Sequence, residues 1–492
     1  MVTADTTAAS SPTAAASAPT ATSQATTALS APTATLQPTA AVSAAMAASA
    51  AAPAFARMPV VERAALMHRV AGALDAAAGE LVPLAAEETR LPAVRLTGEL
   101  GRTTFQLRLY ADEIASGRPL RERHDQAESS PDLFRTAVPI GPVVVFAASN
   151  FPFAFSVLGT DTAAALAAGC PVVVKTHPGH PRLSDRVHEI AAPLFPPGTL
   201  GLVHGEQEGR EVLLDPRIKA AAFTGSPAGG RALFDLAASR PEPIPFYGEL
   251  GSVNPVFVTR AAAARRGPSI WAGFADSYTL GLGQFCTKPG VLILPSSALD
   301  AAASAVAQAL DGHAGGDLLT EKIADGFRAH RPRPSARAIF EGPPGEGRFA
   351  APALFATTAG ALRDDPQGLL EERFGPSALL VAYDEESSLE ALAEIIGGQL
   401  TATVHAEDDD EVAPALVRSL AGVAGRVIWN GWPTGVTVSA AMHHGGPYPA
   451  TTAPLHTSVG PAAIERFLRP VTFQDVPAAV LAILSSSREV DR

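Results

Sequence analysis

Cysteine is rare in this chain, and one of its two cysteines lies where it could do chemistry. Cys286 stands in the segment LGQFCTKPG, after Gly281 and Gly283, in a chain of 492 residues. Glycines allow close backbone approach. A thiolate is a strong nucleophile near neutral pH, but a free cysteine more often behaves as a small buried hydrophobe. Taken alone, Cys286 is therefore either an inert packed thiol or a nucleophile, and other residues must decide.

Three polar residues could accompany such a nucleophile. Glu249 lies in YGELG, where apolar and glycine neighbours could raise the pKa of its carboxyl group into the range of a general base. Asn150 in SNFPFAFS could supply an amide donor, and Lys175 ends the apolar run VVVK. The alternatives are an exposed structural glutamate and an asparagine that only forms a turn before Phe-Pro.

Other familiar catalytic and binding motifs are missing from the sequence. The segment GSPAGGR, which begins at Gly225, has the glycines of a phosphate loop but no Lys-Ser or Lys-Thr pair. There is no G-x-S-x-G and no H-E-x-x-H pattern. His443 and His444 are adjacent, so they cannot share one helical face as a metal pair. We therefore expect no metal site.

The hydrophobic pattern predicts an α/β fold. From about Val42 the pattern is helical, with one amphipathic helix over 61–92 and another over 93–114. Apolar runs at 143–146 and 172–174 flank an alanine-rich helical stretch, which is the pattern of a βαβ unit with parallel strands. Three more strand-like segments follow, LGLVHG, IKAAAFTGS and IPFYGELGSVNPVFV. The ends of such strands deliver loops to one edge of a sheet.

Composition limits the partners and the compartment. The net charge is −12, from 37 basic and 49 acidic residues, which argues against a general nucleic-acid binder. Two cysteines cannot form a disulfide framework, so we expect a reducing cytoplasm. The long uncharged run between Arg135 and Asp161 contains three prolines and therefore predicts a buried strand and a loop, not a membrane span.

The first 41 residues form a low-complexity segment made almost entirely of Ala, Thr, Ser and Pro. Such a segment buries too little bulky apolar surface to offset its ordering entropy, so residues 1–41 are predicted to be disordered. No Lys or Arg precedes Arg57, which argues against a targeting peptide.

Six short motifs decide the interpretation by their order and spacing. They are SNFPFAFS, VVVKTHPGHP, FTGSPAGG, ELGSVNPVFV, GQFCTKPG and EERFGP. Over roughly residues 42–475 the set resembles the aldehyde dehydrogenase superfamily. The segments GRVIWNGWPTGV and MHHGGPYPATT look like those of its α-ketoglutaric semialdehyde (2,5-dioxopentanoate) dehydrogenase group, which also contains NADP-linked fatty aldehyde dehydrogenases.

The resemblance implies a fold and a domain plan. A Rossmann-type cofactor-binding domain is expected over 42–122 and 138–250, and an α/β catalytic domain over 251–458. Short strands within 123–137 and 459–475 should form a small oligomerisation element. The expected assembly is a homodimer, with a tetramer as the alternative. The expected small-molecule partner is an aldehyde.

The resemblance also implies roles for the catalytic residues. Cys286 matches the nucleophile, which forms a thiohemiacetal and then, after hydride transfer, a thioester. Glu249 matches the general base for the thiol, the hydrolytic water or both. Asn150 matches the oxyanion donor, together with the backbone N–H of Cys286. A CoA-acylating relative would lack the glutamate, and an inactive structural homologue would be expected to have lost at least one of the three residues.

Cofactor and substrate residues follow from the same resemblance. The expected cofactor-binding residues are Lys175, His177, Gly225, Ser226, Gly230, Leu250, Glu372 and Phe374. Many NAD-linked relatives carry a glutamate three residues after the lysine, where this chain has Pro178, so we expect NADP in preference to NAD. The expected substrate is 2,5-dioxopentanoate, oxidised to α-ketoglutarate, with Phe151, Trp432 and His443 near it. An aromatic and aliphatic pocket would also admit a fatty aldehyde, which is the alternative substrate.

Overall fold

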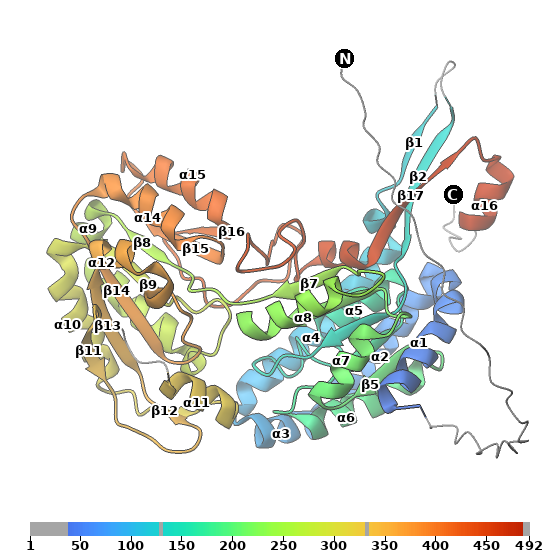
Figure 1. Cartoon of the computed structure of the whole chain (residues 1–492), viewed down its shortest axis with the longest axis horizontal. Coiled ribbons are helices and arrows are strands. Elements are labelled where there is room, and N and C mark those ends of the chain that lie inside the picture. Colours follow the sequence, from blue (N-terminus) through green and yellow to red (C-terminus); the bar gives the residue numbers. More distant parts are fainter. Residues whose placement is uncertain (1–37, 127–130, 330–333, 486–492) are drawn as a thin grey trace, which may run out of the picture. The chain divides into compact units, whose positions relative to one another are not determined.

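The computed structural model describes residues 38–126, 131–329 and 334–485 (Figure 1). Residues 1–37 of the low-complexity segment therefore lie outside the described residues. Helix α1 (Ala40–Arg57) begins where the Thr39 hydroxyl accepts a hydrogen bond from the Val42 N–H. The prediction of disorder was wrong for the last two residues of that segment, because they form the first turn of α1. None of the helices in the described ranges is long and apolar enough to cross a membrane.

A parallel sheet of five strands forms the core of the first half of the chain. Its order is β5 (Leu200–Val203), β4 (Val172–Lys175), β3 (Val143–Phe146), β6 (Ala220–Thr224) and β7 (Phe246–Glu249). Alternate residues of a strand point to opposite faces. Val143 and Val145 pack in one hydrophobic cluster and Val144 and Phe146 in another, so both faces of the sheet are buried. This explains the unbroken apolar runs in the sequence.

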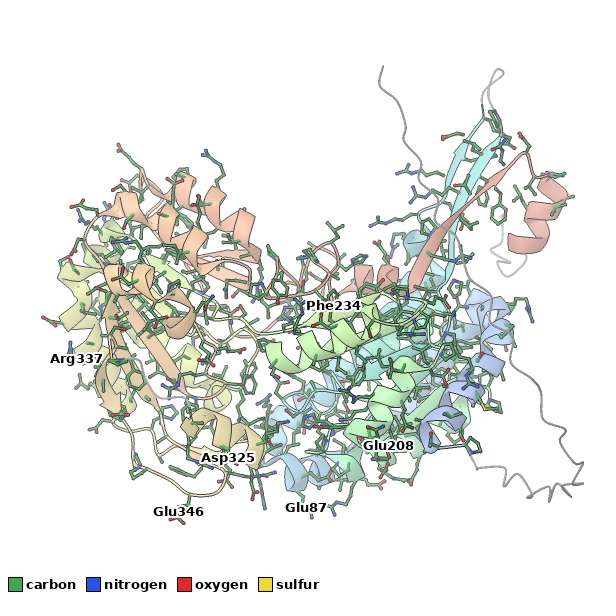
Figure 2. The ribbon with its side chains drawn as sticks, viewed as in Figure 1. Glu87, Glu208, Phe234, Asp325, Arg337 and Glu346 are labelled. Carbon is green, nitrogen blue, oxygen red and sulfur yellow. The ribbon has the colours of Figure 1, made fainter. Side chains whose placement is uncertain are left out.

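Helices cover both faces of this sheet. One face packs against α1, α7 (Glu206–Leu214) and α8 (Pro227–Ala238); on that face, Phe234 of α8 lies edge to face with Phe246 of β7, with ring centroids 6.0 Å apart (Figure 2). The other face packs against α2 (Val60–Ala76), α3 (Ala78–Thr89), α4 (Ala93–Ala115), α5 (Thr160–Ala168) and α6 (Pro181–Ala191).

The single helix predicted over 61–92 is two helices, α2 and α3. The backbone leaves helical geometry at Ala77 (ψ 4°), two residues before Gly79, which disfavours a helix interior.

The strand order creates a crevice at one edge of the sheet. After β3 the chain adds β4 and β5 on one side, then returns to add β6 and β7 on the other. Ligands of open α/β sheets bind at such a switch point, at the carboxyl ends of the strands. Lys175 pairs with Phe146, and Glu249 with Thr224, so these four residues lie at this edge.

A second sheet carries the loop of Cys286. Its seven strands run in the order β11 (Arg337–Glu341), β13 (Ala353–Thr358), β14 (Ser377–Tyr383), β9 (Val291–Pro295), β8 (Val256–Val258), β15 (Gln399–His405) and β16 (Ala424–Trp429). All neighbours are parallel except β11 and β13. One face packs with α9 (Arg260–Thr279) and α10 (Leu299–Leu310), and the other with α12 (Ala359–Asp364), α14 (Leu389–Ile396) and α15 (Ala413–Val423).

The segments predicted as oligomerisation strands form a small antiparallel sheet. It consists of β1 (Arg123–Asp125), β2 (Leu133–Pro139) and β17 (Leu468–Gln474), which Figure 1 shows as a separate ribbon. β17 pairs with β2 of the same chain along its whole length, from Leu468 with Pro139 to Gln474 with Leu133. Short elements complete the description: β10 (Gly316–Asp317), β12 (Phe349–Ala350), α11 (Glu321–Ala329), α13 (Pro366–Leu369) and α16 (Ala478–Ser485).

Candidate active site

The loop of Cys286 has an unusual backbone. It follows the short helix η3 (Leu280–Gly283), in which Gly281, Leu282 and Gly283 have φ of 57°, 55° and 65°. A Cβ atom on Gly283 would lie 2.2 Å from the carbonyl oxygen of Gly375, so only glycine fits there. The buried Asn254 amide donates to the carbonyl oxygens of Cys286 (2.8 Å) and Lys288 (2.9 Å). These contacts fix the position of the thiol.

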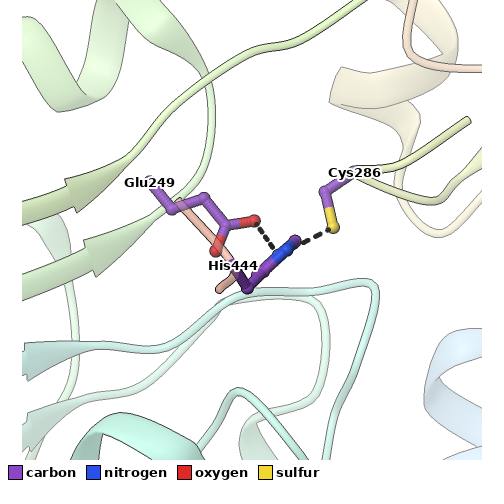
Figure 3. Close-up of side chains that lie close together, drawn as sticks. All are labelled: Glu249, Cys286 and His444. Atoms are coloured by element: carbon purple, nitrogen blue, oxygen red, sulfur yellow. Dashed lines mark hydrogen bonds and ion pairs between the residues drawn. The ribbon is translucent and has the colours of Figure 1, made fainter. Parts of the chain in front are cut away.

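Cys286, His444 and Glu249 form a hydrogen-bonded chain (Figure 3). The Nε2 atom of His444 lies 3.6 Å from the Cys286 sulfur and 3.0 Å from Oε1 of Glu249. The side chains of His444 and Glu249 are only 2% and 4% exposed, whereas Cys286 is half-buried. One ring nitrogen therefore connects a thiol that a ligand can reach to a carboxylate held in the interior.

The segment 444–458 brings His444 to the end of β7. Thr451 forms an antiparallel bridge with Glu249, and the Leu250 N–H donates to the Ala450 carbonyl at 2.8 Å. Further along, the Ser458 hydroxyl donates to Oε2 of Glu249 at 3.0 Å. Both carboxylate oxygens of Glu249 thus have a partner, and the histidine is held on the carboxylate by the backbone of its own segment.

The electrostatics correct one prediction. We expected the apolar context to raise the pKa of Glu249. Burial does act in that direction, but the charge and hydrogen bond of His444 and the hydrogen bond of Ser458 outweigh it and lower the pKa of Glu249. Burial, and then the charge of Glu249, raise the pKa of Cys286 well above its ordinary value. The thiol is therefore protonated at rest and needs a base beside it.

Asn150 lies beside the loop of the nucleophile. Its amide donates to the carbonyl oxygen of Gln284 at 3.2 Å, two residues before Cys286. The side chain is buried, and the backbone carbonyl of Asn150 accepts from Arg95 at 2.7 Å. An amide carries two N–H groups, so one of them remains available for a ligand at the sulfur.

Lys175 and His177 lie at the end of β4, as the sequence placed them. The His177 ring accepts from the Gly179 N–H, and burial, followed by the charges of His180 and Lys175, lowers the pKa of His177 to about 3. Two charged residues that the sequence analysis missed face Lys175. Burial lowers its pKa, Glu206 of α7 opposes that shift and Lys322 of α11 adds to it.

The predicted pyrophosphate site is the start of α8, which follows β6 at the switch point. Ser226 caps this helix, and its hydroxyl accepts from the Gly229 N–H. A Cβ on Gly225 would lie 2.6 Å from the Phe223 ring. One on Gly230 would lie 2.1 Å from a methyl group of Leu250, so these two predicted residues touch. The exposed first turn of α8 offers free N–H groups and a positive dipole end to an anion.

Glu372 and Phe374 lie in the segment between α13 and β14. The Glu372 carboxylate lies against the backbone of Gly251, where a Cβ would be 2.5 Å from Oε2. Burial raises the pKa of Glu372 to about 7, although the ammonium group of Lys288 opposes that shift. Lys288 itself donates to three backbone carbonyls of residues 373–377. Phe374 packs against the hydrophobic cluster of the first sheet.

The three predicted substrate residues differ in their positions. Phe151 stacks edge to face on Phe285, the neighbour of the nucleophile, with ring centroids 5.5 Å apart. Trp432 instead packs on His405 (4.8 Å) and Phe274 (6.1 Å). Within the described ranges, no hydrogen bond or ring contact joins Trp432 or His443 to the nucleophile. The histidine that reaches the sulfur is the next one along the chain, His444.

The sequence analysis dismissed His444 and did not consider Ser458. The adjacent histidines were judged as a metal pair on a helix, but the segment has no regular secondary structure and only His444 is hydrogen-bonded to Glu249. The sulfur, the ring nitrogen and a carboxylate oxygen lie within 4.8 Å of one another, a set of ligand types that zinc accepts. The same three groups are already joined by hydrogen bonds, which suits proton transfer without an ion.

Comparisons with known proteins agree with this geometry. Residues 13–470 match the model of the aldehyde dehydrogenase family. Two α-ketoglutaric semialdehyde dehydrogenases, from Azospirillum brasilense and Acinetobacter baylyi, are 44% and 41% identical over 85% of this chain and 83% of theirs. The crystal structure of a bifunctional proline utilization A protein superposes with a TM-score of 0.78 at 26% identity, over 90% of this chain and 46% of that longer one. This chain therefore belongs to the aldehyde dehydrogenase family.

Proposed function

We propose that this enzyme oxidises 2,5-dioxopentanoate to α-ketoglutarate, with Cys286 as the nucleophile. The observation that carries the catalytic part is the chain from Cys286 through His444 to Glu249. The substrate is supported by the two relatives named α-ketoglutaric semialdehyde dehydrogenase, both above 40% identity over most of the chain. Aldehyde oxidation itself is the activity of the family.

Acylation begins with the transfer of the Cys286 proton to the Glu249 carboxylate, which its hydrogen bonds to His444, Ser458 and Cys286 hold ionised. The Nε2–H of His444, 3.6 Å from the sulfur, donates to the thiolate that forms. The thiolate attacks the aldehyde carbon and forms a thiohemiacetal alkoxide. The free amide N–H of Asn150 and the backbone N–H of Cys286 then donate to that alkoxide.

The residues around the switch point fit a dinucleotide cofactor. Aldehyde dehydrogenases use NAD or NADP, which supplies the acceptor for the hydride that leaves the thiohemiacetal carbon. Ser226 and the first turn of α8 are exposed and would hold the pyrophosphate, and the buried Thr224 hydroxyl beside them has no partner among the described residues. Lys175 would bind the adenosine ribose.

Deacylation requires water and a base. After hydride transfer, Cys286 carries a thioester, and Glu249 releases to solvent the proton that it took from the thiol. Glu249 then accepts a proton from the attacking water. As the carbon–sulfur bond breaks, the sulfur takes that proton back from Glu249 and the acid departs. The same buried carboxylate thus serves both halves of the reaction.

We propose NADP as the preferred cofactor. Pro178 stands where a carboxylate would repel a 2′-phosphate, and Lys175 and Lys322 supply positive charge. Glu206 opposes this preference, because it lies near Lys175 and 3.9 Å from the Lys322 ammonium. The preference should therefore be moderate, and NAD should also support turnover.

We also propose a cytoplasmic homodimer. β17 is the last strand of its sheet, so among the described strands one of its edges is unpaired. Such an edge can add to the sheet of a second copy. Light scattering of the purified protein tests this directly, and a monomer would contradict it.

A steady-state panel tests the proposed function. Reduced cofactor should form fastest with 2,5-dioxopentanoate, more slowly with succinic semialdehyde and most slowly with decanal, and NADP should exceed NAD. Preference for decanal would support a fatty aldehyde dehydrogenase instead. Failure of all aldehydes with both cofactors would contradict an active enzyme.

A further inference from the structure

Helix α4 presents three charged side chains on one face. Arg95, Glu99 and Arg102 follow one another at steps of four and three residues, the spacing of a single helical face. This face meets the loop after β3. Oε1 of Glu99 accepts from the backbone N–H groups of Phe153 (2.7 Å) and Ala154 (3.0 Å), which anchors the helix on that loop.

Aromatic rings connect both arginines to the nucleophile loop. The guanidinium carbon of Arg95 lies 4.7 Å from the ring centroid of Phe285, the residue before the nucleophile, and 5.2 Å from that of Phe151. Arg102 lies 5.8 Å from the centroids of Phe151 and Phe155. Both cations therefore lie over the ring of Phe151, which packs against Phe285 beside the reactive cysteine. These aromatic contacts hold the arginines in place.

The guanidinium groups are not fully satisfied. Nε and Nη2 of Arg102 are buried and have no hydrogen-bond partner among the described residues, and the same holds for Nη1 of Arg95. Nε and Nη2 form one side of the guanidinium fork, the pair that binds a carboxylate with two parallel hydrogen bonds. Leaving such donors unpaired in the interior is costly, so an anion bound there would be stabilised.

Glu99 is not the anion that pairs with the free donors of Arg102. Its Oε1 is used by the backbone, its Oε2 has no hydrogen-bond partner within the described part of the chain, and burial raises the pKa of Glu99 to about 7. The carboxyl group is thus only partly charged at neutral pH and leaves the arginines in excess. The charge of Arg102 also acts on the thiol of Cys286, which places it near the reacting centre.

We propose that Arg102, with Arg95 beside it, binds the carboxylate at the end of the substrate opposite the reacting aldehyde. The substrate class is therefore short aldehydes that end in a carboxylate, with their methylene groups against the packed rings of Phe151 and Phe155. This inference rests on the proposed function and specifies which residues select its substrate. Arg102 determines specificity and takes no part in proton transfer.

The test compares two aldehydes of equal length. Succinic semialdehyde ends in a carboxylate where butanal ends in a methyl group. In Arg102→Gln, KM for succinic semialdehyde and 2,5-dioxopentanoate should rise on the order of 10- to 100-fold, because a charge-assisted pair is lost. The kcat/KM for butanal should change less than about threefold. Glutarate should inhibit the wild type competitively, and Arg102→Gln should weaken that inhibition by a similar factor.

Two further variants serve as controls. Arg108→Gln removes an exposed arginine of the same helix that pairs with Asp75, and it should behave as wild type on all aldehydes. Arg102→Lys keeps the charge without the fork and should show an intermediate loss, even if Arg102→Gln folds poorly. Equal losses on succinic semialdehyde and butanal, or no loss on either, would overturn the role of Arg102. Wild-type enzyme that prefers butanal to both carboxylate-bearing aldehydes would instead overturn the proposed substrate.

Discussion

The Nε2 atom of His444 lies 3.6 Å from the sulfur of Cys286, and the same atom is hydrogen-bonded to a buried carboxylate. A nitrogen that donates to an ionised carboxylate already carries its proton, so it is placed to donate to the thiolate once Glu249 has taken the proton of the thiol. The relationship makes the histidine part of the proposed catalytic machinery, and it can be tested one residue at a time.

Substituting His444 by Asn should slow acylation. Loss of one positioned donor to a developing negative charge typically costs on the order of 100- to 1000-fold, so the burst of reduced cofactor should become slow. Cofactor binding should be unchanged, since no contact joins His444 to the start of α8 among the described residues. Stopped-flow absorbance measures the burst, and His313→Asn, at an exposed site, is the control. A normal burst in His444→Asn would exclude the histidine from acylation.

Ser458→Ala should shift the acidic limb of the pH–rate profile. The Ser458 hydroxyl helps to lower the pKa of Glu249, so its removal should raise that pKa and leave less carboxylate at a given acidic pH. The limb should therefore move to higher pH. The measurement is kcat/KM from pH 9 down to the lowest pH at which both proteins stay folded, since the lowered pKa of Glu249 places the limb below 4.5. A shift to lower pH would contradict the role of the carboxylate.

Glu99→Gln should change stability in a pH-dependent way. Burial raises the pKa of Glu99 from its ordinary 4.5 to about 7, so the folded state holds the proton more tightly than the unfolded state. The stabilisation that this proton gives to the folded state is complete below pH 4.5 and is lost as the pH rises through about 7. The melting temperature of the variant relative to wild type should therefore increase from pH 5 to pH 8. The full effect would be on the order of 3 kcal/mol. A constant difference would contradict a raised pKa.

Glu206→Gln should increase the preference for NADP. The charge of Glu206 raises the pKa of Lys175, and the charge of Lys322 lowers it. Because both are largely exposed, the ratio of kcat/KM for NADP to that for NAD should rise only about threefold in the variant. Lys322→Gln should lower the ratio, and Glu189→Gln, which makes the same charge change on α6, should leave it unchanged. A fall in Glu206→Gln would contradict this cofactor site.

Much of the fold could be predicted because its signals are local. The valine runs of β3 and β4, the alanine-rich α5 and the long α4 all appear in the hydrophobic pattern. The break at Ala77 was missed although Gly79 stands two residues later, because the apolar residues Leu74 and Leu81 keep helical spacing across it. The pairing of β17 with β2 joins segments more than 300 residues apart, and no local pattern specifies it.

The site was predicted unevenly for a related reason. Cys286, Glu249 and Lys175 stand in distinctive motifs, so the sequence points to them. His444 and Ser458 contact Glu249 from about 200 residues away in sequence. The pairing of residues 450–452 with the end of β7 brings these contacts about. The direction of the pKa shift of Glu249 was wrong because its apolar neighbours were visible and its hydrogen-bond partners were not.

The most direct test of the central claim is to trap the acyl-enzyme in Glu249→Gln. With 2,5-dioxopentanoate and NADP, this variant should release a slowed burst of about one NADPH per site and then turn over more slowly still. The loss of Glu249 delays deprotonation of the thiol and removes the base for the water that attacks the thioester. Intact-protein and peptide mass spectrometry should find the acyl group on Cys286, and Cys286→Ala should show neither burst nor adduct. An adduct on another residue, or unchanged steady turnover without any adduct, would contradict the account.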